Sequence, residues 1–325
     1  AAYVGPRAFW QMRPGQIEAL RKRLGLDQPW YLRYIKHTLR MFEGDWGYSA
    51  SNRGEPVLRL LYSRFPATAE LAIVAMVIAI FVGIPLGIKS AVDRNKTSDH
   101  IIRVGMLTAY SIPVYVLGLI MQLVYFQISV RMGLQFNMRE IAYFLPTSRR
   151  FNPVIARPPN SIFFGLLQPT GFLSIDSILS FDPLLFLDAF LHLLAPATVL
   201  GVSLIAIIAR MTRMAMVEVM RADYILLARA KGLNERIIVY RHALRNALLP
   251  VLTIGGIILA NLLTGAIYVE LIFNWPGIGH LVTDSVLILD MPVIHGFCVL
   301  AATIYVTINL VVDLAYAWLD PRIRV

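Results

Sequence analysis

The sequence predicts an all-α protein that crosses a membrane several times, and its composition and its long apolar runs support that prediction. Hydrophobic residues make up 57% of the 325 positions, charged residues make up only 15%, and the mean hydropathy is +0.63. A soluble globular protein contains more charge and less apolar surface than this, so the chain belongs in a bilayer. The net charge of +10 then indicates basic loops that face the cytoplasm rather than nucleic-acid binding.

Five apolar runs are each long enough to cross about 30 Å of hydrocarbon as an α-helix. They occupy residues 67–88, 104–130, 189–209, 247–269 and 293–312. Several contain proline or small residues, which membrane helices tolerate where neighbouring helices satisfy the freed backbone groups and pack closely. These residues are Pro85, Pro113, Pro196, Pro250, Gly255 and Gly256. The pattern predicts a packed bundle of helices rather than a set of independent anchors.

Two polar segments flank or interrupt the predicted spans. Residues 1–66 form an N-terminal segment with a basic amphipathic patch at 14–42, and two interpretations of that patch stay open. The patch either lies on a membrane surface or packs against the bundle. Residues 131–188 are partly rich in proline and too polar to span, so we expect an external insertion there. The membrane domain is predicted to cover residues 67–320, followed by a tail at 321–325.

The basic residues predict which ends of the spans face the cytoplasm. The turn at 93–103, the long basic loop at 210–246, with eight lysines and arginines, and the C-terminal tail fall on one side by parity. The loop at 270–292, on the other side, contains no lysine or arginine. The positive-inside rule therefore places the basic loop and the C-terminus in the cytoplasm, and both polar segments outside. Because this topology leaves the N-terminus outside, we expect a sixth span before Ala1.

The sequence gives little support for metal or disulfide chemistry. Its one cysteine, Cys298, lies inside an apolar run, so neither a disulfide framework nor a cysteine metal site is expected. The six histidines are scattered and form no HExxH pattern. We therefore predict no metal site in this chain.

The basic loop is predicted to form two short helices joined by a turn. Residues 217–231 contain no glycine or proline, and Gly232 can supply the left-handed conformation that often ends a helix. Leu233 is placed to make the accompanying apolar contact, and Asn234 can cap a second helix over 235–246. The pattern alone leaves two interpretations open. The loop either fits an apolar or acidic groove on a soluble partner, or rests on anionic lipid.

Several motifs resemble one family of membrane proteins along nearly the whole chain. The loop contains RMTRMAMVEVMRADYILLARAKGL and RHALRNALLPV, and a later stretch reads GAIYVELIFNWPGIGHL. Earlier positions contain EALRKRLGLDQPWYLRY, GDWGYS and GIPLGI. Together they are similar to the permease subunits of binding-protein-dependent ABC importers of the dipeptide/oligopeptide branch, and the basic loop looks like the cytoplasmic EAA loop of that family. The resemblance implies a type I ABC importer transmembrane domain, and it favours a protein partner for the loop over lipid.

The EAA motif can be placed residue by residue. Gly232 matches its glycine and Ala228 matches the last alanine of its Glu-Ala-Ala triplet, whereas Leu226 and Leu227 replace the first two positions. Ala243 stands where the motif usually ends in proline. These departures put in doubt the ionic contact expected of the missing glutamate.

The resemblance implies that residues 217–246 act as a coupling helix, which inserts into a cleft of a cytoplasmic ATPase subunit. Asp223 or Glu218 could supply the ionic contact of the missing glutamate. The chain contains no GxxxxGK[ST] loop, so we expect a transport subunit and not an enzyme, with ATP and magnesium bound by partner subunits. The expected contact residues are Asp223, Ala228, Arg229, Ala230, Lys231, Gly232, Leu233, Asn234, Glu235 and Arg236.

The implied partners are two ATPase subunits, a second and homologous permease subunit, and an extracytoplasmic solute-binding protein. The implied location is the prokaryotic cytoplasmic (inner) membrane, and the implied cargo is a dipeptide or oligopeptide. Members that resemble this chain also carry glutathione, nickel complexes or oligosaccharides. A stand-alone secondary transporter is an alternative, although the acidic residues flank the spans and we detect no inverted repeat. A membrane-embedded enzyme is disfavoured, because HExxH, GxSxG and paired intramembrane aspartates are absent.

Polar residues in the predicted spans are the candidates for the translocation path, because their burial in lipid is costly. They are Gln122, Tyr125, His192, Asn261, Thr264 and Asn309, with Glu270 at an outer helix end. Hydrogen bonding between helices is the alternative interpretation for each of them.

Overall fold

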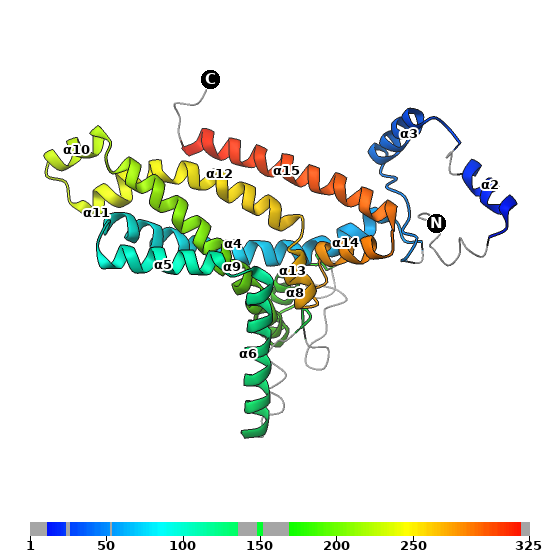
Figure 1. The fold of residues 1–325 in the computed structure, drawn as a ribbon, viewed down its shortest axis with the longest axis horizontal. Coiled ribbons are helices and arrows are strands. Elements are labelled where there is room, and N and C mark those ends of the chain that lie inside the picture. Colours follow the sequence, from blue (N-terminus) through cyan, green and yellow to red (C-terminus); the bar gives the residue numbers. More distant parts are fainter. Residues whose placement is uncertain (1–11, 24–26, 53, 136–147, 152–168, 320–325) are drawn as a thin grey trace.

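The computed structural model describes residues 12–23, 27–52, 54–135, 148–151 and 169–319. Four long helices lie side by side in an elongated bundle (Figure 1). Within the described ranges every named element is helical, so the all-α prediction is confirmed. The four long helices are α4 (Val57–Val92), α9 (Pro183–Val219), α12 (Leu244–Leu263) and α15 (Met291–Leu319).

Glycines bring the backbones of α4 and α9 close together. A Cβ added at Gly87 would lie 2.6 Å from the carbonyl oxygen of Ala209, and one added at Gly201 would lie 2.9 Å from Cγ2 of Ile78. Neither position accepts a larger residue unless its surroundings move, as is usual where membrane helices pack through small residues. Of the two glycines that the sequence suggests for such contacts, Gly256 makes one, because a Cβ there would collide with Cγ2 of Val312 in α15, whereas Gly255 faces open space.

Four helices in the described ranges are long and apolar enough to cross a membrane. Each of them covers one of the predicted spans and extends beyond it. An apolar run marks the part of a helix that faces hydrocarbon, and the helix continues into the polar regions at both surfaces. Helix α4 thus starts at Val57, ten residues before the apolar run that begins at residue 67. The four candidate spans are Val57–Val92, Pro183–Val219, Glu235–Ile272 and Met291–Trp318.

The predicted span at 104–130 is not one continuous helix. α5 (Thr97–Ser111) and α6 (Val114–Gln135) meet at Pro113 with a bend of 93°, and α6 projects from the bundle (Figure 1). Proline lacks an amide hydrogen and disfavours helical geometry at the residue before it. Ile112 is accordingly extended, with φ −79° and ψ 119°. The predicted span is therefore bent at Pro113, and it is a fifth span when its two halves are taken together.

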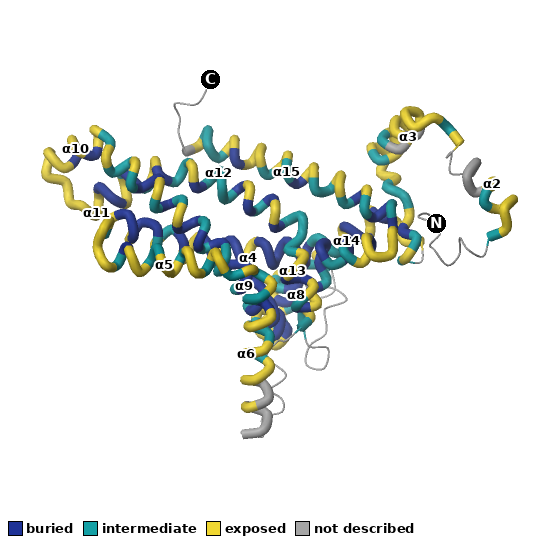
Figure 2. Tube along the Cα trace, viewed as in Figure 1, coloured by how far each residue is buried: buried dark blue, intermediate teal, exposed yellow. Residues whose placement is uncertain are grey.

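The two ends of the bundle carry different elements (Figure 1). At one end lie α10 (Asp223–Ala230) and α11 (Glu235–Ile237), and at the other lie α14 (Ile278–Leu287) and α3 (Trp30–Phe42). α3, preceded by α2 (Pro14–Arg23), stands away from the bundle and exposes apolar side chains (Figure 2). Of the two interpretations of this patch, packing against the described bundle is therefore wrong. The predicted tail at 321–325 lies outside the described residues.

Two shorter helices pack against longer ones near the point from which α6 projects (Figure 1): one contacts α9, and the other contacts α14 and α6. They are α8 (Leu173–Leu179), which belongs to the predicted insertion, and α13 (Ile267–Ile272). The predicted span at 247–269 is interrupted before α13, because Gly265 has φ +120° and a Cβ there would lie 2.8 Å from Cα of Gly279. The interruption lets α13 pack against α14.

Candidate functional site

The basic loop folds into a helix, a glycine turn and a second helical segment at one end of the bundle (Figure 1). α9 ends at Val219, and Ala222 is extended, with φ −68° and ψ 148°, before α10 begins at Asp223. The predicted single helix over 217–231 is therefore wrong. The helix dipole favours an acidic residue in the first turn of a helix, so Asp223 supports the new start.

The turn after α10 has the geometry that the sequence predicts. Gly232 has φ +74°, and its amide donates to the carbonyl oxygen of Arg229 at 2.9 Å. The amide of Leu233 donates to the carbonyl oxygen of Ala228 at 3.3 Å. These two bonds form a Schellman motif, in which the residue after the helix is left-handed and is usually glycine. The predicted glycine turn is confirmed.

The segment after the turn begins as predicted and continues further than predicted. The Asn234 side chain accepts a hydrogen bond from the amide of Arg236 at 2.9 Å and caps α11. The prediction of a helix over 235–246 is only partly correct, because α11 passes through a π-helical turn, η1 (Ile238–Ala243), directly into α12. The glycine turn is thus joined to a membrane-spanning helix without a flexible linker.

The predicted contact residues divide into one buried residue and an exposed set. Ala228 is 8% exposed and packs with Ile225, Met216 and Ile238 in an apolar cluster beneath the loop. Its side chain holds α10 on the bundle and presents little surface to a partner. The exposed residues are Asp223, Arg229, Ala230, Lys231, Gly232, Leu233, Asn234, Glu235 and Arg236, of which Arg229 and Glu235 form an ion pair at 2.8 Å.

Sequence reasoning missed the apolar part of this surface. Leu226 and Leu227 are 53% and 57% exposed, although the motif comparison treats them only as departures from Glu-Ala. A helix that buries Ile225 and Ala228, three positions apart, must turn the residues between them outward. That spacing was the signal in the sequence that could have predicted the exposure of Leu226 and Leu227. Adjacent exposed apolar side chains indicate a contact site. We call the following residues the loop face: Tyr224, Leu226, Leu227, Leu233, Ile237 and Tyr240.

A buried ion pair joins three helices near the loop. Asp99 of α5 is buried, and Arg213 of α9 pairs with it through Nε to Oδ1 at 2.9 Å and Nη2 to Oδ2 at 3.0 Å. Ser90 of α4 donates its hydroxyl to Asp99 Oδ1 at 2.6 Å. The cluster therefore fixes the last turns of α9, which lead into the loop, to α4 and α5.

The Asp99→Asn substitution is expected to lower the free energy of unfolding by about 1.5–3 kcal/mol, because it removes the charge that Arg213 pairs with. Thermal unfolding of the purified protein in detergent measures the loss. Asp93→Asn is the matched control, since Asp93 pairs with the exposed Lys96 at 2.9 Å and a surface pair contributes about 0–1 kcal/mol. Equal effects of the two substitutions would contradict a special role for the Asp99 cluster.

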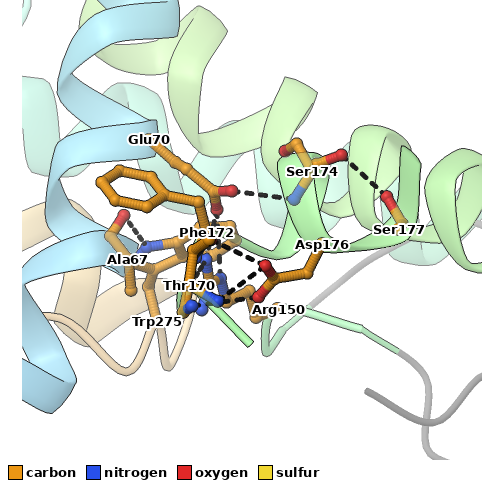
Figure 3. Close-up of polar contacts among 10 residues, drawn as sticks. Ala67, Glu70, Arg150, Thr170, Phe172, Ser174, Asp176, Ser177 and Trp275 are labelled. Atoms are coloured by element: carbon orange, nitrogen blue, oxygen red, sulfur yellow. Dashed lines mark hydrogen bonds and ion pairs between the residues drawn. The ribbon is translucent and has the colours of Figure 1, made fainter. Parts of the chain in front are cut away.

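A second ion pair fastens the predicted insertion to α4 (Figure 3). Arg150 Nη2 lies 2.5 Å from Oε2 of Glu70 and 2.8 Å from the carbonyl oxygen of Gly171. The amide of Ser174, in α8, donates to Glu70 Oε1 at 2.8 Å. Sequence reasoning missed this contact because Arg150 and Glu70 are 80 positions apart, and no local pattern pairs them.

The ring of Trp275 completes this cluster. The Arg150 guanidinium carbon lies 6.0 Å from the centroid of the ring, and Trp275 Nε1 donates to the carbonyl oxygen of Ala67 at 2.8 Å (Figure 3). Asp176 orders the neighbouring chain, because its Oδ1 accepts from the Thr170 amide at 2.8 Å and from the Thr170 hydroxyl at 2.7 Å. The insertion is thus tied to the bundle where α4, α8 and the segment after α13 meet.

Two of the candidate path residues form hydrogen bonds between helices, which is their alternative interpretation, and a third bonds within its own helix. Gln122 donates to the carbonyl oxygen of Ile272 at 3.2 Å and joins α6 to α13. Asn261 of α12 accepts from the hydroxyl of Tyr305 in α15. Thr264 donates its hydroxyl to the carbonyl oxygen of Asn261 at 2.8 Å. The first two bonds hold helices together, the third lies at the end of α12, and contact with cargo stays a prediction.

The other four candidates lie in separate surroundings. His192 is buried, and its Nδ1 lies 2.8 Å from the carbonyl oxygen of Asp188. Tyr125 packs beside the main apolar core, and Asn309 is exposed on α15. Glu270 is 0% exposed and accepts hydrogen bonds from several parts of the chain. Within the described ranges, no group of three or more His, Cys, Asp or Glu side chains is placed to hold a metal ion.

Comparison with known proteins gives the class to which this bundle and loop belong. Residues 83–325 match the family described as "Binding-protein-dependent transport system inner membrane component". This match covers more than half of the chain, and the chain belongs to that family. The expected type I importer fold is therefore confirmed, and the protein is an inner-membrane transport component.

Particular relatives are similar along almost the whole chain. The probable D,D-dipeptide transport system permease protein DdpB of Escherichia coli (strain K12) is 41% identical over 94% of this chain and 84% of its own length. The di/tripeptide transport system permease protein DppB of Pseudomonas aeruginosa is 40% identical, with the same coverage of both chains. The dipeptide transport system permease protein DppB of Escherichia coli (strain K12) is 39% identical over 99% of this chain and 88% of its own length.

Proposed function

We propose that this chain is a membrane-spanning permease subunit of an ATP-driven importer of dipeptides or oligopeptides. It forms half of the translocation pathway, beside a second and homologous permease subunit. Support for a peptide cargo is the similarity to dipeptide and di/tripeptide permeases, at 39–41% identity over nearly the whole chain. Support for a role in coupling comes from the loop at 217–246.

The observation that carries the coupling role is an exposed loop face above a buried apolar cluster. The exposed leucines and tyrosines of the loop face fit an apolar cleft, and the nearby Arg229, Lys231 and Arg236 fit acidic residues at its rim. Beneath them, Ile225 and Ala228 pack with residues of α4, α9, η1 and α12. When the ATPase subunits close, a displaced α10 therefore moves these helices with it.

In this proposal ATP and magnesium bind to two ATPase subunits in the cytoplasm, next to α10. The C-terminal end of α15 lies toward the same end of the bundle, which supports a cytoplasmic C-terminus (Figure 1). An extracytoplasmic solute-binding protein then docks at the other end, on the side of α14 and the insertion. The proposed site is the prokaryotic cytoplasmic membrane, where the chain works as one subunit of a heteromeric complex.

Reconstitution in proteoliposomes tests this proposal. The chain is purified with its partner subunits, and uptake of labelled dipeptides, longer peptides, glutathione, a nickel chelate and an oligosaccharide is compared. We expect peptide uptake only when ATP is present on the side of the ATPase subunits and the loaded binding protein is present on the other. Preferred uptake of one of the other solutes would keep the transporter class and change the cargo.

The same vesicles test the alternative of a stand-alone secondary transporter. Vesicles that contain this chain without its partners are expected to show no peptide flux, with or without an ion gradient. Flux that follows a proton or sodium gradient in these vesicles would overturn the ATP-driven function.

A further inference from the structure

Helix α3 separates its cations from its apolar side chains. In a helix with 3.6 residues per turn, Lys36 and Arg40 lie one turn apart on the same side. Arg33 and His37 fall on this same side by register, whereas the opposite side carries, apart from Thr38, aromatic and aliphatic residues, among them Trp30, Tyr31, Tyr34, Ile35, Leu39 and Phe42. A helix with basic residues on one side and large apolar residues on the other is typical of segments that lie in a membrane interface.

The apolar side of α3 is left uncovered by the described part of the chain. Trp30 is 74% exposed, Tyr34 is 68% exposed and Phe42 is 87% exposed. Figure 2 shows α3 as a mostly exposed element that stands apart from the bundle. Contiguous apolar surface of this kind marks a contact with a membrane or with another protein. The position of the helix decides between these two.

Trp46 anchors the chain that follows α3 to the outer ends of two long helices. It packs against an apolar cluster that contains Val57, the first residue of α4, and Val293, in the first turn of α15. Its Nε1 also donates to the carbonyl oxygen of Met41, within α3, at 3.1 Å. Because the ring contacts both the bundle and the end of α3, it holds the last turn of α3 close to these two helix starts.

Asp290 adds a polar anchor at the same place. The hydroxyls of Ser49 and Ser51 each donate to Asp290 Oδ2 at 2.6 Å. Burial acts to raise the pKa of Asp290, but the bonds from both serines outweigh it and hold the pKa below its usual range, so the carboxylate stays ionised. Asp290 directly precedes the candidate span Met291–Trp318, and the start of that span lies at a membrane surface.

We propose that α3 is an interfacial helix, which lies on the membrane surface at the end of the bundle opposite α10 and binds anionic phospholipid headgroups. Its apolar side enters the boundary between headgroups and acyl chains, where tryptophan and tyrosine are enriched. Lys36 and Arg40 are exposed and face the phosphates. Although Lys36 Nζ donates to Gln28 Oε1 at 2.8 Å, an ammonium group has further donors for a phosphate.

This assignment explains why a segment placed outside by topology is basic. The positive-inside rule predicts few lysines and arginines near the outer ends of spans. Pairing with lipid phosphates gives the cations of α3 a partner at the surface itself. The inference needs only the membrane-spanning bundle, so it holds for any cargo and for any source of energy.

Spin labels in the assembled transporter test the depth of each side of α3. In a Cys298→Ser background, which removes an exposed thiol, single labels are attached after Ile35→Cys, Leu39→Cys, Lys36→Cys or Arg40→Cys. The protein is embedded in nanodiscs that contain phosphatidylglycerol. Labels at 35 and 39 are expected to collide mainly with oxygen, which dissolves in lipid, and labels at 36 and 40 mainly with a water-soluble nickel chelate.

Two other collision patterns would overturn the proposal. Equal access of the nickel chelate to all four labels would place α3 in water. Labels at 35 and 39 that are shielded from both reagents would show a protein partner on the apolar side, and measurement of the chain without its partner subunits would show whether that partner is another subunit.

The role of the cations is tested by changing the lipid. Exchange of phosphatidylcholine for phosphatidylglycerol is expected to raise the oxygen collision rate at position 39 by about twofold or more, because each cation near an anionic surface is attracted to it. The double substitution Lys36→Gln and Arg40→Gln, which leaves only Arg33 among the cations of α3, is expected to reduce that rise by more than half. Arg94→Gln with Lys96→Gln, two exposed cations in the turn between α4 and α5, is the matched control and should preserve it. A rise that is unchanged by the loss of Lys36 and Arg40 would contradict headgroup binding.

Discussion

Replacing Gly232 with valine is expected to abolish peptide uptake and the ATP hydrolysis that accompanies it, while the chain still reaches the membrane. The reason is the backbone: Gly232 has φ +74°, and a left-handed conformation costs a β-branched residue about 1–2 kcal/mol. No neighbouring atom lies within 4 Å of a Cβ added there, so the substitution causes no clash inside the chain. Its effect comes from a redirected turn between α10 and α11, which displaces the loop face.

Two further substitutions separate backbone conformation from added bulk. Gly232→Asn is expected to retain most transport, because asparagine tolerates the left-handed conformation at a helix end. Gly105→Val, in α5, adds the same side chain at a helical glycine whose Cβ would also meet open space, and we expect near-normal transport. Uptake, ATP hydrolysis and the amount of protein in the membrane are measured together. Normal uptake by the Gly232→Val protein would contradict the coupling role of the loop.

The parts of the fold that the sequence predicts correctly depend on local chemistry. The sequence predicts that Gly232 forms a turn and that Asn234 caps a helix, and the structure shows both. The apolar runs likewise locate the spans, because each run must lie in hydrocarbon whatever its neighbours are. Predictions of this kind need no knowledge of which helices touch.

The bend at Pro113 shows where local chemistry stops being sufficient. Pro85, Pro196 and Pro250 lie inside α4, α9 and α12, and these helices continue through them. Pro113 has the same covalent restriction, yet the chain turns by 93° there. A proline removes one hydrogen bond in every case, and packing around the helix decides whether the helix continues.

The polar clusters were unpredictable for a related reason. Thr68 and Glu270 bond to each other across 202 positions of sequence, and Ser49 and Asp290 do so across 241. Hydropathy identifies a polar residue in an apolar run as costly, but it does not say which distant group offsets that cost. Glu270 was thus open to two interpretations, contact with cargo or bonding between helices. The two interpretations predict different effects of its replacement on the stability of the protein and on the KM for transport.

Replacing Glu270 with alanine is expected to lower the free energy of unfolding by about 3–5 kcal/mol, because each buried donor left without an acceptor costs about 1–3 kcal/mol. Oε1 accepts from the Thr68 hydroxyl at 2.9 Å and Oε2 accepts from the His280 amide at 2.9 Å. The carboxylate thereby joins α13 to α4 and α14. A Cβ added at Gly277 would lie 2.5 Å from Oε2, so the glycine in the WPGIGH stretch leaves room for this carboxylate.

The Glu270→Gln substitution separates two roles of Glu270: joining helices through hydrogen bonds, and contacting cargo. A glutamine has one acceptor oxygen and an amide that can only donate, so it cannot accept from Thr68 and His280 as a carboxylate does, and most of the stability loss should persist. Thermal unfolding in detergent measures both variants, and Glu55→Ala, at an exposed glutamate, is the control. If Glu270 instead contacts cargo, its replacement would raise the KM for transport and leave the unfolding temperature unchanged. That pattern would return Glu270 to the translocation path, whereas a lowered unfolding temperature with an unchanged KM would keep it as the residue that joins three helices.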